Sequence, residues 1–391
     1  MSFCDIIIKK YVQYLIHFEG VMTMIIGLPK EQEITENRVG LTPDNVKELI
    51  NDGHHVIVEH EAGLASGFSD EAYQAAGATL VEEVAKVWAA EMVIKVKKPL
   101  KEEYAYFHKD LILFSYLHLA ADPDLAQALL DNEVTCIAYE TMVDKGTLPL
   151  LKPMSEVAGR MAVQIGAHLL EKNHGGPGIL LGGVPGVKRA NVTIIGGGVV
   201  GLNSAKLACG LGANVTIIDI TPHRLAKIEH TLGYPVQTLV SNEANIHESV
   251  VNSDLVIGSV LVAGRRAPIL VKEETVQQMK SGSVLIDVAV DQGGNFATTH
   301  ETTHSEPTYV KYGVTHYAVS NIPGAVPQTA TIALTNASLF YTKEIANKGI
   351  IQAAKNNHTI LTGINTYQGH ITNLAVAESQ DREFVALEAL I

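Results

Sequence analysis

The sequence predicts an α/β protein of two doubly wound domains, the first of them discontinuous, joined by long helices. Three observations predict this class. Strand-like and helix-like segments alternate along most of the chain, as in parallel sheets covered by helices. The length of 391 residues is more than one ordinary core supports. A glycine-rich turn joins a strand to a helix near the middle of the chain.

The first half of the chain predicts a parallel sheet. Strands are expected at 24–28, 55–59, 92–96, 111–116 and 134–138, with helices near 69–76, 81–90 and 123–131. Thr42 followed by Pro43 predicts the start of another helix, and Gly53 predicts its end. The run 111–116 is apolar on both faces, which favours a strand covered on both sides.

The glycine-rich turn has the context that a dinucleotide site requires. It follows the strand 192–195 and opens a helix, and Asp219 ends the next strand. Gly196 permits the tight turn, Gly198 lets a pyrophosphate approach the backbone, and Gly201 lets the helix lie close to the strand. The helix N-terminus offers N–H groups to phosphates, and Asp219 is placed to accept hydrogen bonds from a ribose 2′-OH. We therefore predict a Rossmann-like dinucleotide-binding domain.

The order of elements around this turn predicts the domain boundaries. A helix from Ser155 to about Lys172 precedes a glycine-rich connector, and the long helix Pro327 to Asn347 returns the chain to the first domain. Strands of the second domain are expected at 192–195, 215–218, 255–258, 284–287 and 315–319. We expect an N-terminal extension (1–23), the first part of a substrate domain (24–149), an NAD-binding domain (150–327) and the return of the substrate domain (328–391).

Composition excludes several classes of function. A net charge of −13 disfavours a nucleic-acid or anionic-membrane surface, because either needs basic patches. No apolar run reaches the roughly 18 residues of a membrane helix. Three scattered cysteines, Cys4, Cys136 and Cys209, disfavour a disulfide framework and indicate a cytoplasmic protein. In the first 23 residues, two lysines interrupt the apolar run, which is the wrong order for a signal peptide.

Four reactive side chains follow predicted strands. Lys97, His118 and Asp291 come at strand ends, and Arg38 lies just past the first strand. Ligands of parallel sheets bind outside those ends. Arg38 would pair with a substrate carboxylate, Lys97 would polarise a carbonyl oxygen, and His118 would move a proton, with Asp291 on the nicotinamide side. Each has a plainer interpretation: the cluster 95–98 as a solvated strand end, and His118 as a core histidine.

One motif points to a different chemistry. His300-Glu301-Thr302-Thr303-His304 matches the HExxH pattern of zinc proteases, which requires a helix so that both imidazoles share a face. The segment is β-branched, lacks helical periodicity and is followed by Pro307, so we expect a polar loop and no metal there.

Several segments resemble the alanine dehydrogenase family. They are ENRVGLTP (36–43), KVKKP (95–99), YLHLA (116–120), PMSEVAGRMAVQIGA (153–167), LGGVPGV (181–187), DVAVDQGG (287–294) and NIPGAVPQT (321–329). The resemblance runs from about Met24 to the C-terminus. Three positions depart from the usual family pattern, which has Met and Arg where this chain has Ile322 and Gln328, and more often Glu where it has Lys98.

The resemblance implies an activity and a set of site residues. The activity is reversible NAD-dependent deamination of L-alanine to pyruvate and ammonium by a homohexamer. Arg38, Lys97 and His118 fall on the carboxylate, carbonyl and acid–base positions, and Asp291 on the catalytic aspartate. Ser155, Asp219, Val260, Leu261 and Asn321 would lie around cofactor and substrate.

The alternative is the NAD-binding subunit of a proton-translocating transhydrogenase, which shares this two-domain fold. Such subunits lack the aspartate at position 291, and the Lys97 and His118 pair also favours the dehydrogenase. A plain NAD-sensing module leaves the Arg, Lys and His side chains without a role.

Overall fold

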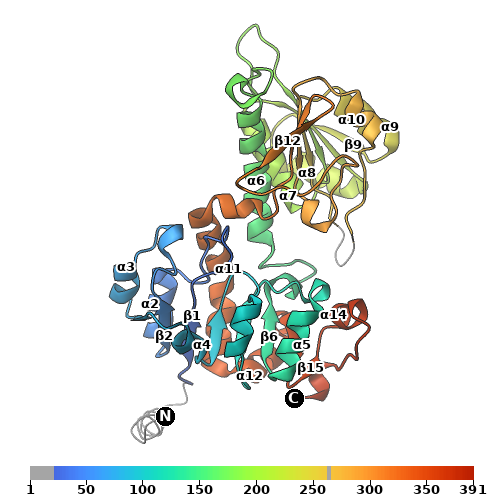
Figure 1. The fold of residues 1–391 in the computed structure, drawn as a ribbon. Coiled ribbons are helices and arrows are strands. Elements are labelled where there is room, and N and C mark those ends of the chain that lie inside the picture. Colours follow the sequence, from blue (N-terminus) through green and yellow to red (C-terminus); the bar gives the residue numbers. More distant parts are fainter. Residues whose placement is uncertain (1–21, 262–265) are drawn as a thin grey trace, which may run out of the picture. The chain divides into compact units, whose positions relative to one another are not determined.

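The structure is a computed structural model that describes residues 22–261 and 266–391 (Figure 1). The chain divides into two compact units, one extending to Pro153 and including Val326–Ile391, the other comprising Met154–Ala325. Both units are organised around a mostly parallel sheet, so the predicted fold class is confirmed: two Rossmann-like α/β domains. Most of the expected extension 1–23, with Cys4, lies outside the described residues.

The sheet of the first unit has eight strands in the described chain, in the order β15-β14-β6-β5-β4-β1-β2-β3. They are β1 Ile25–Leu28, β2 His55–Glu59, β3 Thr79–Val81, β4 Met92–Ile94, β5 Ile112–Ser115, β6 Thr135–Ala138, β14 Ile364–Tyr367 and β15 His370–Ile371. Strands β1 to β6 are parallel, whereas β14 is antiparallel to β6 and β15 is antiparallel to β14. The chain leaves β1 toward β2 and later returns to its other side as β4. This reversal is a topological switch point, where open sheets bind ligands.

The helices that start at Pro43, Pro123 and Pro327 begin where the sequence signals predict. Thr42 caps α2 (Pro43–Asn51): its hydroxyl accepts from the Asn45 N–H, and the Asn45 side chain accepts from the Thr42 N–H. The long helix α11 (Pro327–Lys348) ends at Gly349. The others are α3 Asp70–Ala75, α4 Val84–Trp88, α5 Pro123–Asp131, α12 Ile350–Asn356, α13 His358–Gly363 and α14 Leu374–Ser379.

The second unit contains a seven-stranded sheet in the described chain, in the order β12-β13-β11-β10-β7-β8-β9. Its strands are β7 Asn191–Ile195, β8 Asn214–Asp219, β9 Gln237–Val240, β10 Leu255–Gly258, β11 Val284–Asp287, β12 Thr308–Lys311 and β13 Val314–Tyr317. Its helices are α7 Val199–Gly210, α8 Pro222–Leu232, α9 Glu243–Val251 and α10 Glu273–Gln277. Only β12 is antiparallel among these strands. The switch point lies between β7 and β10.

Several boundaries differ from the sequence-based expectation. The helix expected at 81–90 is shorter, because Thr79–Val81 forms an edge strand beside β2 and the helix starts at Val84. The helix expected at 155–172 is α6, Lys152–Leu169, with Pro153 in its first turn, and a separate 3₁₀ turn, η5, covers Lys172–His174. Strands β9, β12, β14 and β15 were not expected.

Among the helices of residues 22–261 and 266–391, none combines the length and the apolar character that crossing a membrane would require.

Candidate active site

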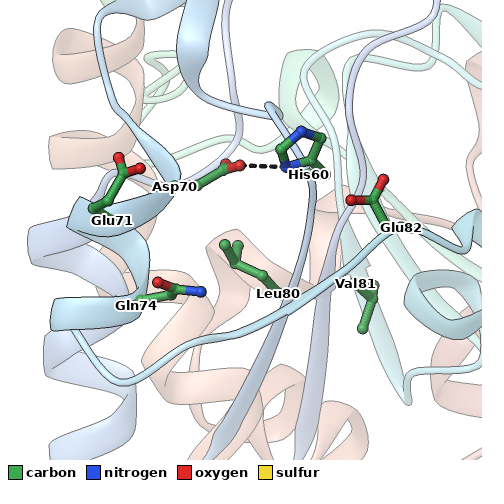
Figure 2. Close-up of a pocket in the computed structure, with 7 residues that line it drawn as sticks. All are labelled: His60, Asp70, Glu71, Gln74, Leu80, Val81 and Glu82. Carbon is green, nitrogen blue, oxygen red and sulfur yellow. Dashed lines mark ion pairs between the residues drawn. The ribbon is translucent and has the colours of Figure 1, made fainter.

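A polar hollow lies on the first unit beside α3 and β3 (Figure 2). It is lined by His60, Asp70, Glu71, Gln74, Leu80, Val81 and Glu82. The Nδ1 atom of His60 lies 2.5 Å from an Asp70 carboxylate oxygen, and Asp70 also accepts a hydrogen bond of 3.0 Å from the backbone N–H of Glu61. The imidazole and the carboxylate therefore satisfy each other. None of the predicted chemical residues lines this hollow.

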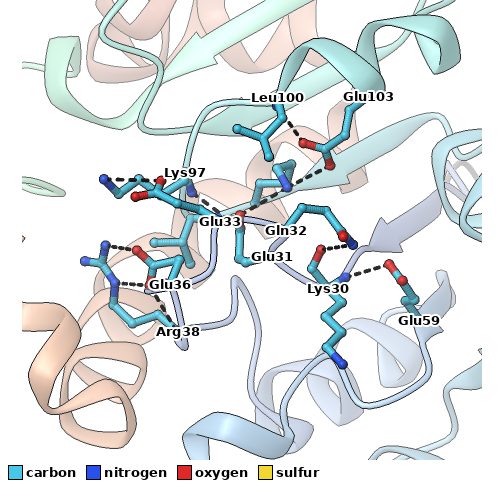
Figure 3. A network of polar contacts seen from close by, with 12 residues as sticks. Lys30, Glu31, Gln32, Glu33, Glu36, Arg38, Glu59, Lys97, Leu100 and Glu103 are labelled. Carbon is cyan, nitrogen blue, oxygen red and sulfur yellow. Dashed lines mark hydrogen bonds and ion pairs between the residues drawn. The ribbon is translucent and has the colours of Figure 1, made fainter. Parts of the chain in front are cut away.

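The predicted chemical residues of the first unit lie at the switch point of its sheet. Arg38 follows β1, Lys97 follows β4 and His118 follows β5, and these three strands are neighbours. Arg38 and Lys97 flank the reversal between β1 and β4 directly. Figure 3 shows both in one network of polar contacts. The sheet topology therefore gathers, at the ligand-binding edge, residues that are about 80 positions apart in the sequence.

Arg38 is a buried cation held by Glu36. Its Nε atom donates to Glu36 at 2.7 Å and a terminal nitrogen donates at 2.5 Å, while the Arg38 backbone N–H donates to the same carboxylate at 3.0 Å. Burial alone would raise the pKa of Glu36, but the hydrogen bonds and charge of Arg38 outweigh it and lower the pKa. This two-point contact fixes the plane of the guanidinium group, which is the property that recognition of a flat carboxylate exploits. Sequence reasoning did not identify Glu36.

A buried ion triad lies beneath this network. The Lys95 ammonium is 1% exposed and lies 3.1 Å from a Glu31 oxygen and 3.0 Å from a Glu103 oxygen. Burial would lower the pKa of Lys95, but the two carboxylates raise it and keep the ammonium charged. The interpretation of the 95–98 cluster as a solvated strand end is therefore wrong for Lys95, because its side chain points into the fold and only its neighbours reach solvent.

Glu31 also holds the backbone beside Lys97. Its carboxylate accepts hydrogen bonds from the N–H groups of Val96 (2.6 Å) and Lys97 (3.4 Å). Glu31 belongs to the segment that carries Arg38, so one carboxylate joins the two strand ends on either side of the switch point. The Lys97 side chain is about a quarter exposed, and its ammonium lies 3.7 Å from Glu33 (Figure 3). Lys97 thus combines an ordered backbone with a solvent-accessible amine.

His118 is not a core histidine, because its side chain is exposed. It occupies the left-handed backbone region at φ 49°, which is rare for a residue with a side chain. The Glu140 carboxylate accepts a hydrogen bond of 2.6 Å from the His118 N–H and bonds of 3.2 and 3.3 Å from the Leu117 N–H. The His118 ring lies roughly parallel to that of Tyr116, with ring centroids 6.4 Å apart. The loop therefore holds the imidazole in an unusual, defined position.

The glycine turn of the second unit has the space that a dinucleotide needs. A Cβ atom at Gly201 would lie 1.8 Å from the Gly196 carbonyl oxygen, and Gly196 itself has φ 104°. At Gly198 a Cβ atom would meet nothing within 4 Å, so the backbone faces open space there. Ser155 lies on α6, which packs against α7 at Gly159, whose carbonyl accepts from Ser204 at 2.8 Å. The three glycines thus occupy positions that the dinucleotide fingerprint explains.

Asp219 ends β8, the strand next to the glycine turn. Its carboxylate accepts hydrogen bonds from the N–H groups of Gly197 (2.7 Å) and Thr221 (2.8 Å), and Arg224 lies 3.0 Å from it. Burial would raise the pKa of Asp219, but these partners outweigh it and lower the pKa. Asp219 is therefore an ionised acceptor at the place where a ribose diol binds in such folds.

On the other side of the switch point, β10 leads to Val260 and Leu261. The backbone N–H of Val260 donates to the Asn295 side chain at 2.9 Å, and the Asn295 amide donates back to the Val260 carbonyl at 3.0 Å. Leu261 is 42% exposed. The sequence pattern did not reveal Asn295, which fixes this segment opposite the glycine turn.

Asp291 lies in a 3₁₀ turn after β11, in a loop closed by Asp287. The Asp287 carboxylate accepts hydrogen bonds from the N–H groups of Ala289 (3.1 Å) and Asn295 (2.9 Å). Burial raises the pKa of Asp287 to about 6. Asp291 is exposed, whereas Asp287 is almost completely buried, so the two aspartates of this motif differ in environment.

The His300–His304 segment does not form the helix of a zinc protease. It is irregular apart from a bridge between Thr302 and Val319. The His300 ring stacks on Tyr309 with centroids 3.8 Å apart, and the His304 Nε2 atom lies 3.2 Å from the Asn321 carbonyl oxygen. Asn321 has φ 61°, so its loop also has a constrained backbone. The expected polar loop is confirmed.

Fold and site define a class: two-domain α/β proteins that bind a dinucleotide at one switch point and present Arg, Lys and His side chains at the other. Comparison with known proteins identifies the group within this class. Residues 27–158 match the family domain described as "Alanine dehydrogenase/PNT, N-terminal domain", and residues 162–374 match "Alanine dehydrogenase/PNT, C-terminal domain". The chain belongs to the alanine dehydrogenase/PNT family.

Individual relatives agree with this assignment. The chain is 59% identical to the alanine dehydrogenase of Bacillus subtilis (strain 168) over 93% of this chain and 97% of that protein. A solved structure of an L-alanine dehydrogenase matches with a TM-score of 0.89 and 50% identity, covering 92% of this chain and 99% of the other. A transhydrogenase structure from Sinorhizobium meliloti matches with a TM-score of 0.78 and 25% identity, covering 90% and 99%. The similarity to dehydrogenases is therefore the stronger.

Proposed function

We propose that this protein is an alanine dehydrogenase, which catalyses the reversible reaction of L-alanine, NAD⁺ and water to pyruvate, ammonium, NADH and a proton. The observation that carries the proposal is the gathering of Arg38, Lys97 and His118 at the switch point of the first sheet, in a chain whose family relatives are alanine dehydrogenases. A module that only binds NAD has no use for these three groups.

In the first unit, each group has a distinct role. Arg38 binds the carboxylate of alanine or pyruvate through its planar guanidinium group. Lys97 stabilises negative charge on the substrate oxygen, which develops as ammonia adds to pyruvate and, in the opposite direction, as the carbinolamine expels ammonia. His118 transfers the protons of the amine, the carbinolamine and water. The substrate domain comprises 24–149 and 328–391.

The proposed NAD-binding domain, 150–327, contains the whole second unit, Met154–Ala325. NAD⁺, when bound, accepts the hydride from the substrate Cα. Gly196, Gly198 and Gly201 make room for the pyrophosphate, and Asp219 accepts hydrogen bonds from the ribose diol. Val260 and Leu261 border the cofactor across the switch point, and Ser155 contributes from α6. We assign proton transfer to Asp291 and substrate binding to Asn321, as the family resemblance implies.

The family also suggests the assembly and the compartment. We propose a homohexamer in the cytoplasm, which light scattering would detect as a particle of about six times the 42.0 kDa chain mass.

One spectrophotometric experiment tests the function. NADH formation is followed with L-alanine, and with L-serine, glycine and L-glutamate as comparisons. We expect L-alanine to give by far the highest kcat/KM. A well-folded protein that binds NADH but turns over none of these amino acids would favour a transhydrogenase-type subunit instead.

A further inference from the structure

We propose that His168, Glu171 and His174 form a binding site for a divalent transition-metal ion such as Zn²⁺. The three residues lie in the second unit, where α6 ends and the 3₁₀ turn η5 follows. They take no part in the proposed catalysis, so this inference stands independently of the proposed function. The metal pattern recognised in the sequence was at 300–304, and the spacing of His168, Glu171 and His174 was not recognised.

The donor atoms already converge. The Nδ1 atom of His168 lies 3.7 Å from one Glu171 oxygen, and the Nε2 atom of His174 lies 3.8 Å from the other. The ring centroids of the two histidines are 3.6 Å apart, and all three donor atoms lie within 4.8 Å of one another. Ligands about 2.1 Å from a tetrahedral ion lie roughly 3.4 Å from one another. The two rings would have to move apart for both nitrogens to reach one ion, and rotation about the side-chain bonds of these exposed residues allows that.

The backbone that carries these ligands is tightly organised. The Glu171 N–H donates to the His168 carbonyl at 3.1 Å, and the N–H groups of His174 and Gly176 both donate to the Glu171 carbonyl at 3.1 Å. Leu170, between the first two ligands, is fully buried. A Cβ atom at Gly176 would lie 2.3 Å from a backbone oxygen, so only glycine fits there. The ligands are thus presented by a fixed turn, which reduces the entropy lost on binding.

The donor set selects the type of ion. Two imidazoles with one carboxylate suit Zn²⁺, Co²⁺, Ni²⁺ or Cu²⁺, whereas Mg²⁺ and Ca²⁺ prefer oxygen ligands only. The side chains of His168, Glu171 and His174 are 56%, 57% and 39% exposed, so water can complete the coordination shell. Within residues 22–261 and 266–391, no other three His, Cys, Asp or Glu side chains bring their donor atoms this close.

A bound ion would join the end of α6 to the turn that leads toward β7. Because such an ion binds the folded turn and not the unfolded chain, it would stabilise this region in proportion to its occupancy. Metal binding at this site thus stabilises the segment that leads from α6 into the dinucleotide-binding sheet.

Calorimetric titration of the full-length, chelator-treated protein with Zn²⁺ tests the proposal. We expect one site per chain, unaffected by Mg²⁺. His168→Gln and His174→Gln should each weaken binding at least tenfold, since loss of even an outer-shell partner costs about 10–100-fold. The double variant should lose the site, together with the visible absorption bands of the Co²⁺-substituted protein.

His60→Asn is the matched control, because His60 contacts the Asp70 and Glu61 carboxylates without the three donor atoms converging as they do at His168, Glu171 and His174. This variant should bind Zn²⁺ like the wild type. The ligands are exposed, so all variants should melt at the same temperature without metal. Equal Zn²⁺ affinity and stoichiometry in the wild type and the double variant would overturn the proposal, as would loss of the site in His60→Asn alone.

Discussion

Replacing Glu140 by alanine should impair turnover by releasing the loop of His118. The Glu140 carboxylate accepts hydrogen bonds from the backbone N–H groups of Leu117 and His118, and it belongs to the first unit, whereas the dinucleotide turn and Asp219 belong to the second. It therefore acts as a positioning residue: it holds the backbone from which His118 projects.

Two free-energy costs in the loop of His118 set the size of the effect on turnover. A non-glycine residue in the left-handed region costs about 1–2 kcal/mol, and the φ of 49° places His118 there. A buried backbone N–H left without its acceptor costs about 1–3 kcal/mol, which applies to the N–H of the buried Leu117. If the free energy that favours the observed loop conformation falls by about 2 kcal/mol, the population of that conformation changes roughly 30-fold. We therefore expect kcat with L-alanine to fall by about 10- to 100-fold.

The assay compares kcat, NADH affinity and melting temperature in the same preparation. Glu140→Gln should be milder than Glu140→Ala, because its amide oxygen can still accept from the His118 N–H. Glu102→Gln is the matched control, since Glu102 is an exposed glutamate of the same unit. NADH affinity should not change in any of them. Wild-type kcat in a well-folded Glu140→Ala protein would refute the argument, and so would a parallel loss of NADH binding.

Three further predictions concern the proposed site. His118→Asn should lower kcat by roughly 10²–10⁴ while NADH affinity and melting temperature are kept; near-normal turnover in the folded variant would exclude the acid–base role. NAD should be strongly preferred over NADP, because the Asp219 carboxylate repels a 2′-phosphate. The Arg224→Ala variant should retain that preference, since two backbone N–H groups still hold Asp219. Comparable kcat/KM values for the two cofactors would contradict this prediction. Burial raises the pKa of Asp287 from 3.8 to about 6, so its contribution to stability is complete below pH 3.8 and is lost as the pH rises through 6, by roughly 3 kcal/mol. Between about pH 4 and pH 6.5, the unfolding free energy of the wild type should therefore fall relative to that of Asp287→Asn. A difference between the two proteins that does not depend on pH would show that Asp287 ionises normally.

The sequence predicted those parts of the fold whose signals are local. Thr42 and Pro43 start a helix because a hydroxyl acceptor and a fixed φ act within one turn. The central strands are continuous apolar runs, which helices on both faces require. Strands β14 and β15 were missed, because Ile364–Tyr367 becomes a strand only by pairing with β6, more than 200 residues earlier. No local pattern contains that information.

In the candidate site, too, residues with a local signal were recognised, whereas contacts between distant segments were not. Arg38, Lys97 and His118 were recognisable as reactive groups after predicted strands, and the order β5-β4-β1 brings those strand ends together. Lys95 was misassigned because its spacing from Lys97 matches a solvated strand end, whereas the two carboxylates that bury it come from other segments. Glu140 was overlooked because a single glutamate after a strand has no pattern to distinguish it.

The residues that sequence reasoning overlooked have one physical role in common. Glu31, Glu140 and Asp287 each use a carboxylate to accept backbone N–H groups of a segment that follows a parallel strand. Such segments lie beyond the end of a strand, so their N–H groups have no acceptor on a neighbouring strand. Without another acceptor, their conformation would be unrestrained. An ionised acceptor gives the strongest replacement, because hydrogen bonds to a charged group are about twice as strong as neutral ones. Reactive side chains at strand ends therefore need acids that perform no chemistry themselves, and such an acid can be recognised only once the fold shows which N–H groups it faces.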